Sequence, residues 1–328
     1  MAINLPEIKK RLSTLLKDPD LVEPYLLRYG ADIKIENIKK LKSSMSSDMT
    51  KPYEDKDTPG EDPLYESKVE CPICGLKGIT SFQLRSKALA VTENLFLIPS
   101  YTPTQGFRHV NYTYLYITVC PRCLFASPDK RDFASKDPKT EKPIPSKLSS
   151  NAIMLLQEEM GKRNLIMKSV SDYENYFSRP RSPAAAIKSL RLAGTTADAE
   201  IHFSLPYGYY KKGTYLLRTA GILREFRRHN TKEIQSALDA YEEAFKTSNC
   251  PSEEIEMRVL YLIIALNIFF KRFKKANSYL AMFSTLKNRR EAEMRSDPSL
   301  SAQAINKWLE KARFVWEDRE RDDLFEGI

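Results

Sequence analysis

The chain has 328 residues, of which 42% are hydrophobic and 29% are charged, and its formal net charge is +9. This length allows two or three domains with buried cores, and the composition is that of an ordinary globular protein. The longest apolar run, residues 260–270, is too short to span a bilayer, and the N-terminal residues lack the apolar core of a secretory signal, so we expect a cytoplasmic protein without a membrane span. The positive charge is spread over the middle and C-terminal parts of the chain, which permits a nucleic-acid partner without requiring one.

The N-terminal region predicts short helices followed by a flexible segment. Apolar residues recur at helical spacing between Ile8 and Leu16, and a second helix should end at Gly30. Residues 43–62 are rich in Ser, Asp, Lys and Pro and have few apolar side chains to bury. We therefore expect short helices in residues 1–42 and a linker after them.

Residues 63–135 carry the β-strand signals of the chain. In residues 111–119 tyrosines alternate with aliphatic residues, a period-two pattern that predicts a strand. A weaker strand is expected over residues 81–91, and residues 102–106 predict a loop before the longer strand. The sequence therefore predicts a small β module.

Four of the five cysteines form two Cys-x-x-Cys pairs within this module. Two residues between thiols place both sulfurs on one side of a tight turn, and two such turns can form a closed tetrahedral site. Because the cytosol keeps thiols reduced, metal binding is favoured over disulfides. The predicted metal ligands are Cys71, Cys74, Cys120 and Cys123. The fifth cysteine, Cys250, is expected to be a partly buried and unreactive thiol.

A thioredoxin-like redox pair is the main alternative to a metal site. That chemistry needs one pair after a strand in a β-α-β setting, whereas two pairs occur here without one. Zinc is the favoured occupant, although iron in a rubredoxin-like site takes the same ligands. Four thiolates would fill the coordination sphere and His109 is the only histidine near the module, so we expect a structural metal rather than a catalytic one. A chelator should then unfold residues 63–135.

The chain after the β module predicts a linker and then helices. Residues 128–147 contain four prolines and many charges, and the linker itself is placed at residues 136–147. Beyond it, helical periodicity predicts a series of helices, and Pro, Asn and Ser residues mark the expected helix ends. These cover about residues 147–161, 183–194, 207–229, 232–248, 253–270, 273–288 and 299–322.

Two consecutive helix pairs in this region are similar to tetratricopeptide units. In the first pair, Ala237, Tyr241 and Ala244 have the spacing of a second repeat helix, where small residues allow close approach. In the second pair, residues 262–280 repeat the apolar pattern, but the turn is shorter than in the usual unit. A plain helical bundle is the alternative.

The cysteine pairs and the helices together resemble a known bacterial family. Tyr65 begins the arrangement Tyr-x-x-x-x-x-Cys-Pro-x-Cys-Gly, a strand signal leads into the second Cys-Pro-x-Cys pair, and YKKGTYLLRTAGILREF follows at residues 210–226. These features resemble the uncharacterised domain-of-unknown-function family 2225 over about residues 63–270. The resemblance implies a metal-binding module joined to tetratricopeptide-like helices in a cytoplasmic bacterial protein, with no established activity.

Three basic segments could form a stripe for nucleic acid, at residues 181–192, 224–230 and 271–275, although each is also typical of a solvated helix face. Residues 202–213 mix aromatics with lysines, which suits base stacking but equally suits a hydrophobic loop leading into a helix. The sequence contains no phosphate-binding loop, nucleophile elbow or zinc-protease motif. We therefore expect that the protein is not an enzyme, with a thiol oxidoreductase as the weak alternative.

The expected fold is α+β and predominantly α, with a small zinc-ribbon-like β module followed by a tetratricopeptide-like helical domain. The expected function is a non-catalytic cytoplasmic scaffold, in which a structural four-cysteine zinc module supports a helical domain that binds a protein partner. The alternative is a zinc-dependent nucleic-acid-binding regulator that uses the basic helices. The predicted parts are helices at 1–42, a linker at 43–62, the four-cysteine module at 63–135, a linker at 136–147 and the helical domain at 148–328.

Overall fold

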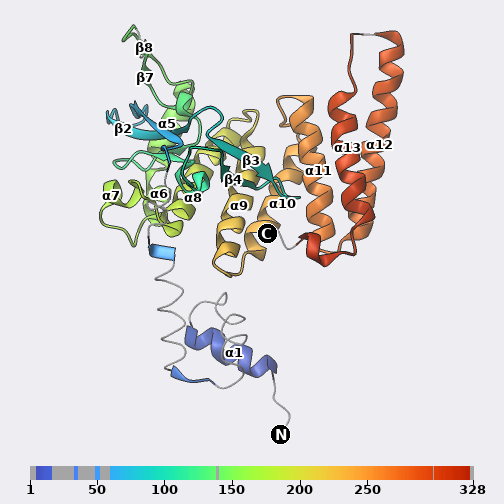
Figure 1. The fold of residues 1–328 in the computed structure, drawn as a ribbon, viewed down its shortest axis with the longest axis horizontal. Coiled ribbons are helices and arrows are strands. Elements are labelled where there is room, and N and C mark those ends of the chain that lie inside the picture. The colour runs from blue at the N-terminus through green and yellow to red at the C-terminus, as the bar shows by residue number, and fades with distance from the viewer. Residues whose placement is uncertain are drawn as a thin grey trace.

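The computed structural model describes residues 5–16, 33–35, 49–51, 60–137, 140–297 and 299–325. Its fold is α+β and predominantly α, as predicted, with small two-stranded antiparallel sheets beside a long series of helices (Figure 1). Within the described residues, no helix is both long enough and apolar enough to cross a membrane.

The first N-terminal helix is confirmed as α1 (Leu5–Leu16). Leu12 is buried, whereas Arg11 and Thr14 are exposed, which is the amphipathic pattern that predicted the helix. The second expected helix, ending at Gly30, and most of the expected linker lie outside the described residues.

Each cysteine pair lies in the turn of a β hairpin. β1 (Leu64–Val69) pairs antiparallel with β2 (Ile79–Leu84) on either side of the first pair. β5 (Thr118–Val119) pairs antiparallel with β6 (Ala126–Ser127) on either side of the second pair. Because β2 also packs against β5, the two hairpins lie next to each other.

The strand expected over residues 81–91 is two strands separated by a turn. Its first residues belong to β2, and its last residues belong to β3 (Leu89–Glu93), which pairs with β4 (Pro99–Pro103). Lys87 in the turn has a φ of 62°, a left-handed conformation that interrupts a strand. The loop expected at residues 102–106 begins only where β4 ends.

The prediction of a single strand over residues 111–119 is wrong. The helix α4 (Tyr112–Leu115) occupies its centre, and only β5 near its end is extended. The Asn111 side chain caps α4 by accepting a hydrogen bond from a backbone amide in its first turn. All four residues of α4 are buried, so the tyrosine and aliphatic positions face the core alike. The alternation therefore did not mark a boundary between core and solvent.

The segment expected to be a linker at residues 136–147 contains folded structure. The 3-10 helix η2 (Lys130–Asp132) precedes β7 (Ser135–Lys136), which pairs with β8 (Pro143–Ile144). Pro143 is tolerated in β8 because a strand of a two-stranded sheet has one edge that needs no backbone donor. The described part of this segment is therefore a hairpin rather than an open linker.

The helices predicted after residue 147 are all present, with shifted ends. The first predicted helix, at about residues 147–161, corresponds to two helices, α5 and the start of α6, and α7 was not predicted. Ser182 caps α8 and Pro183 occupies its first turn, as the sequence indicates. The helices are α5 (Ser150–Glu158), α6 (Met160–Ile166), α7 (Tyr173–Phe177), α8 (Pro183–His202), α9 (Gly208–Glu225), α10 (Thr231–Lys246), α11 (Glu253–Phe269), α12 (Phe273–Ser296) and α13 (Gln303–Glu317), followed by the 3-10 turn η3 (Asp322–Phe325).

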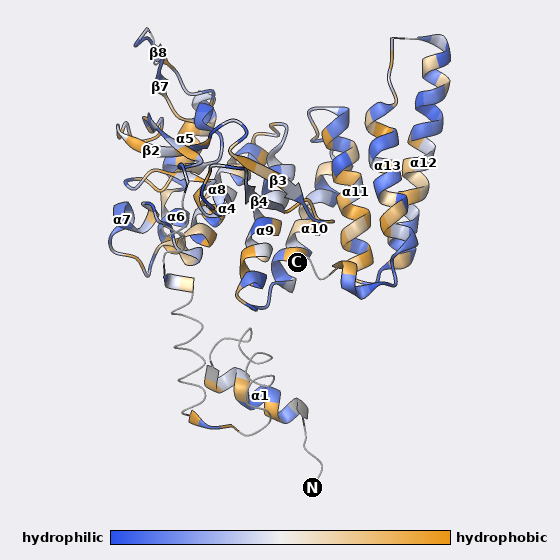
Figure 2. Ribbon diagram, viewed as in Figure 1, coloured by the Kyte–Doolittle hydropathy of each residue, from blue (hydrophilic) through white to orange (hydrophobic). Residues whose placement is uncertain are grey.

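Neighbouring helices pack against one another in chain order from α8 to α11. After α11 the order changes, because α13 packs against both α11 and α12 and lies between them in Figure 1. Figure 2 shows many apolar residues on α11, whereas the upper part of α12 is polar. The turn between β3 and β4 inserts Phe96 into the same core as α9, α10 and α11. Helices and hairpins thus share their hydrophobic cores.

Gly213 of α9 lies against the ring of Tyr241 in α10. A Cβ atom at Gly213 would lie 2.7 Å from that ring. We expect Gly213→Ala to lower the free energy of unfolding by about 1–3 kcal/mol, because the helices would have to move apart. In Gly194→Ala, the control in α8, the added Cβ meets no atom within 4 Å, so stability should be unchanged or higher by up to about 1 kcal/mol. Urea denaturation compares the two variants, and equal effects would contradict the close approach of α9 and α10.

Candidate metal centre

The two hairpin turns bring the four predicted cysteines together. The Sγ atoms of Cys71 and Cys123 are 3.5 Å apart, as are those of Cys74 and Cys120. All four sulfurs lie within 4.8 Å of one another. Four thiolates around one zinc ion at about 2.3 Å would have sulfurs about 3.8 Å apart, whereas a disulfide needs about 2.05 Å. The four sulfurs are therefore close enough together to bind a single metal ion.

The two turns have the same backbone conformation. In the first, the Cys71 amide donates to the carbonyl of the residue five positions on, and the Gly75 amide donates to the Cys71 carbonyl, both at 2.9 Å. In the second, the Cys120 amide and the Leu124 amide make the equivalent hydrogen bonds at 2.8 and 2.9 Å. Gly75 and Leu124 occupy the same left-handed position, with φ values of 69° and 61°. The site is thus formed from two copies of one local structure.

The thiols compete for ionisation when no cation is bound. Hydrogen bonds from Cys123 and Cys71 lower the pKa of Cys120. The hydrogen bond to Cys120 in turn raises the pKa of Cys71. Four thiolates this close repel one another, so a bound cation is needed for all of them to ionise together.

A buried arginine lies beside the cysteines. Arg163 of α6 has no exposed surface, and its Nε donates to the Cys123 carbonyl at 2.9 Å while its Nη2 donates to the Leu156 carbonyl at 2.5 Å. Burial lowers the pKa of Arg163, and negative charge on the nearby cysteines opposes that shift. Its Nη1 is buried without a partner. A divalent metal with four thiolates carries two negative charges, so the donor set and this unpaired cation fit a metal-tetrathiolate centre.

The metal centre also contacts the helices that follow it. The cysteines share one hydrophobic cluster with Leu156 of α5 and Ala199 of α8. The Gln157 side chain of α5 donates to the Ile73 carbonyl inside the first turn at 3.0 Å. The site therefore lies at the junction between the hairpins and the helices.

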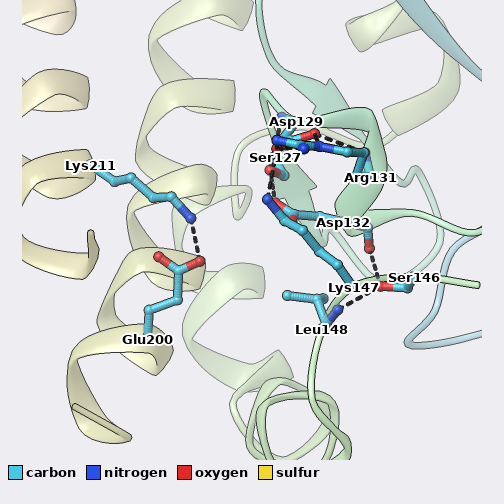
Figure 3. A network of polar contacts seen from close by, with 9 residues as sticks. All are labelled: Ser127, Asp129, Arg131, Asp132, Ser146, Lys147, Leu148, Glu200 and Lys211. Carbon is cyan, nitrogen blue, oxygen red and sulfur yellow. Dashed lines mark hydrogen bonds and ion pairs between the residues drawn. The ribbon is translucent and has the colours of Figure 1, made fainter. Parts of the chain in front are cut away.

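A polar network fixes the end of β6 to the chain just before α5 (Figure 3). Ser127 donates to the buried Asp132, and Lys147 lies 3.3 Å from Asp132 and 2.7 Å from Asp129. Burial opposes ionisation of Asp129, but the hydrogen bonds from Arg131 and Lys147 outweigh it and lower its pKa. A second ion pair, between Glu200 and Lys211, joins α8 to α9 in the same view. The contacts among Ser127, Asp129, Asp132 and Lys147 hold the second cysteine hairpin in place.

Other candidate residues lie apart from the four sulfurs. Among the described residues, the group of potential ligands contains neither His109 nor Cys250. Cys250 is half-buried, and burial raises its pKa to about 11, in line with the expected unreactive thiol. Arg163 could not be predicted from the sequence, because a single arginine in a helical pattern gives no sign of facing a metal site.

The family model described as "Uncharacterized protein conserved in bacteria (DUF2225)" matches residues 64–308. The match includes both cysteine hairpins and continues through the helices into α13, further than the resemblance seen in the sequence. Searches of curated proteins and of solved structures find no match. The two cysteine pairs, the most specific part of the resemblance, are the residues that meet in the candidate metal centre. This chain belongs to the DUF2225 family.

Proposed function

We propose that the protein is a non-catalytic cytoplasmic scaffold, in which a structural zinc ion holds the β hairpins against helices that bind a partner protein. The observation that carries the proposal is the closed four-cysteine site next to the buried Arg163. Four thiolates leave a zinc ion no open position for a substrate, so its role there is structural. Iron would use the same ligands, and metal analysis of the purified protein distinguishes the two.

The proposed partner site is an apolar groove of about 620 Å³ formed by the β3–β4 turn, α11, α13 and η3. Phe314 of α13 lines this groove and is 53% exposed. A large exposed aromatic in an apolar groove is typical of protein-binding surfaces, and a short segment with apolar anchor residues would fit it. The other apolar residues of the groove are Leu95, Leu97, Tyr261, Val315 and Leu324.

The tetratricopeptide-like part of the proposal depends on the pairs α9/α10 and α11/α12. Ala237 and Tyr241 of α10 are buried, and Gly213 allows α9 to approach them closely. Ala276 is buried in the second helix of the next pair. The position of α13 between α11 and α12 departs from the stacking of regular repeats, so the proposal is limited to these two pairs.

The nucleic-acid alternative has less support. Several basic side chains in the predicted stripe already have partners within the protein, which reduces their contribution to phosphate binding. Lys271 pairs with Asp322, Lys275 pairs with Glu242, and the buried Arg181 donates to backbone carbonyls.

A photo-crosslinking experiment in the native cells tests the proposed groove. With Phe314→p-benzoylphenylalanine, we expect a crosslink to one defined protein that survives nuclease treatment. The control is Leu165→p-benzoylphenylalanine in α6, because Leu165 is also apolar and is 74% exposed but lies outside the groove. Identical crosslinks from both positions, or products lost on nuclease treatment, would argue against a protein-binding groove.

A further inference from the structure

A small cavity of about 20 Å³ lies where the β3–β4 turn meets α9, α10 and α11. Its wall contains Arg218 of α9 and Arg258 of α11, together with Tyr210, Thr214 and Tyr241. The other wall residues are apolar. A cavity of this size holds one group about as large as a water molecule.

The two arginines have three buried donor nitrogens without an acceptor, namely Nε and Nη1 of Arg218 and Nε of Arg258. The charge of Arg258 is balanced, because its Nη2 donates to Glu93 at 2.7 Å. The guanidinium of Arg218 lies 3.9 Å from the centre of the Tyr116 ring, and no carboxylate among the described residues forms an ion pair with it. The Arg218 side chain also has a hydrogen bond to Tyr101, which is a phenol and not a carboxylate. A buried donor without an acceptor is costly, so the three nitrogens lack an acceptor and the charge of Arg218 lacks an anion.

The phenols around the cavity do not supply the missing charge. Burial raises the pKa of both Tyr210 and Tyr241, which keeps them neutral. The Tyr241 hydroxyl lies 3.3 Å from the Thr214 hydroxyl, which donates to the Tyr210 carbonyl at 2.9 Å. These groups are neutral dipoles beside two cations.

We propose that this cavity binds a small monovalent anion, with chloride as the abundant candidate, between Arg218 and Arg258. The anion would accept hydrogen bonds from the unpaired N–H groups and balance the charge of Arg218. A water molecule would satisfy the donors but would leave that charge uncompensated. The bound anion also stabilises the insertion of the β3–β4 turn between the helices.

Thermal unfolding of the full-length protein tests this proposal. The melts compare sodium chloride with sodium gluconate at equal ionic strength, because gluconate is too large for the cavity. We expect chloride to raise Tm by a few degrees in a saturable manner, and bromide to reproduce the effect. A Tm that does not depend on the anion would overturn the proposal.

Two arginine variants locate the effect. Arg218→Met should abolish the chloride-dependent rise in Tm, whereas Arg224→Met, at an exposed position of the same helix, should retain it. A chloride effect that persists in Arg218→Met would count against the site.

A second measurement needs no variant, in case Arg218→Met does not fold. Crystals of the unaltered protein grown in bromide should show an anomalous scattering peak between the two guanidinium groups. An ordered water there without anomalous signal would contradict anion binding.

Discussion

Cys120→Ser should lose the bound metal ion and much of the protein's stability. The serine oxygen is a poor substitute for a thiolate, and Cys120 is fully buried between the two hairpins. In small zinc peptides the metal contributes about 10–16 kcal/mol. The helices here share the core with the site, so part of the fold should survive, but we expect the free energy of unfolding to fall by at least several kcal/mol. Metal analysis and urea denaturation measure the two losses.

Cys250→Ser is the matched control, because Cys250 lies outside the group of four. It should keep one metal ion per chain, and its stability should change by no more than about 1 kcal/mol. A full metal content in Cys120→Ser, or an equal loss in both variants, would show that the four cysteines do not form the site.

Arg163→Met should weaken metal binding without removing a ligand. Methionine fills a similar volume but does not supply the positive charge or the hydrogen bonds to the Cys123 and Leu156 carbonyls. Loss of a group next to the ligands typically reduces metal affinity about 10–100-fold. Removing one member of a buried charge pair typically destabilises a protein by about 3–5 kcal/mol. Competition with a chromogenic chelator measures the affinity.

Arg122 provides the comparison for Arg163. Its guanidinium also donates to the carbonyl of a metal-site cysteine, Cys74, at 3.5 Å, but its side chain is exposed. Arg122→Met should therefore leave the metal affinity nearly unchanged. If the two variants behaved alike, burial of the charge beside the thiolates would not matter.

The four clustered cysteines and the helices could be predicted because their signals are local. Spacing within each pair sets the turn geometry, and capping residues such as Ser182 mark a helix start regardless of the tertiary structure. The prediction of a strand at residues 111–119 failed because an alternating pattern indicates a strand only when one side of the segment faces the core and the other faces solvent. There the helices cover Tyr114 and Ile117, while the strands β1, β2 and β3 cover Tyr112 and Leu115, which only the folded chain reveals.

The contacts between distant segments were not predictable for the same reason. Arg163 reaches the cysteines across forty residues of sequence, and Phe96 enters a helical core from a hairpin turn. Both depend on how the hairpins pack on the helices, and neither has a sequence spacing that would indicate it. The expectation that residues 63–135 unfold as one unit on metal removal also changes, since the β3–β4 hairpin packs with α9, α10 and α11.

Hydrogen–deuterium exchange of the intact protein, with and without its metal ion, tests the central claim most directly. The claim is that the metal centre joins the cysteine hairpins to the helices next to them. It predicts that metal removal exposes the amides of β1, β2, β5 and β6 together with those of α5 and α8, while α11 and α13 stay protected. Unchanged exchange throughout, or exposure limited to the two cysteine hairpins, would contradict it.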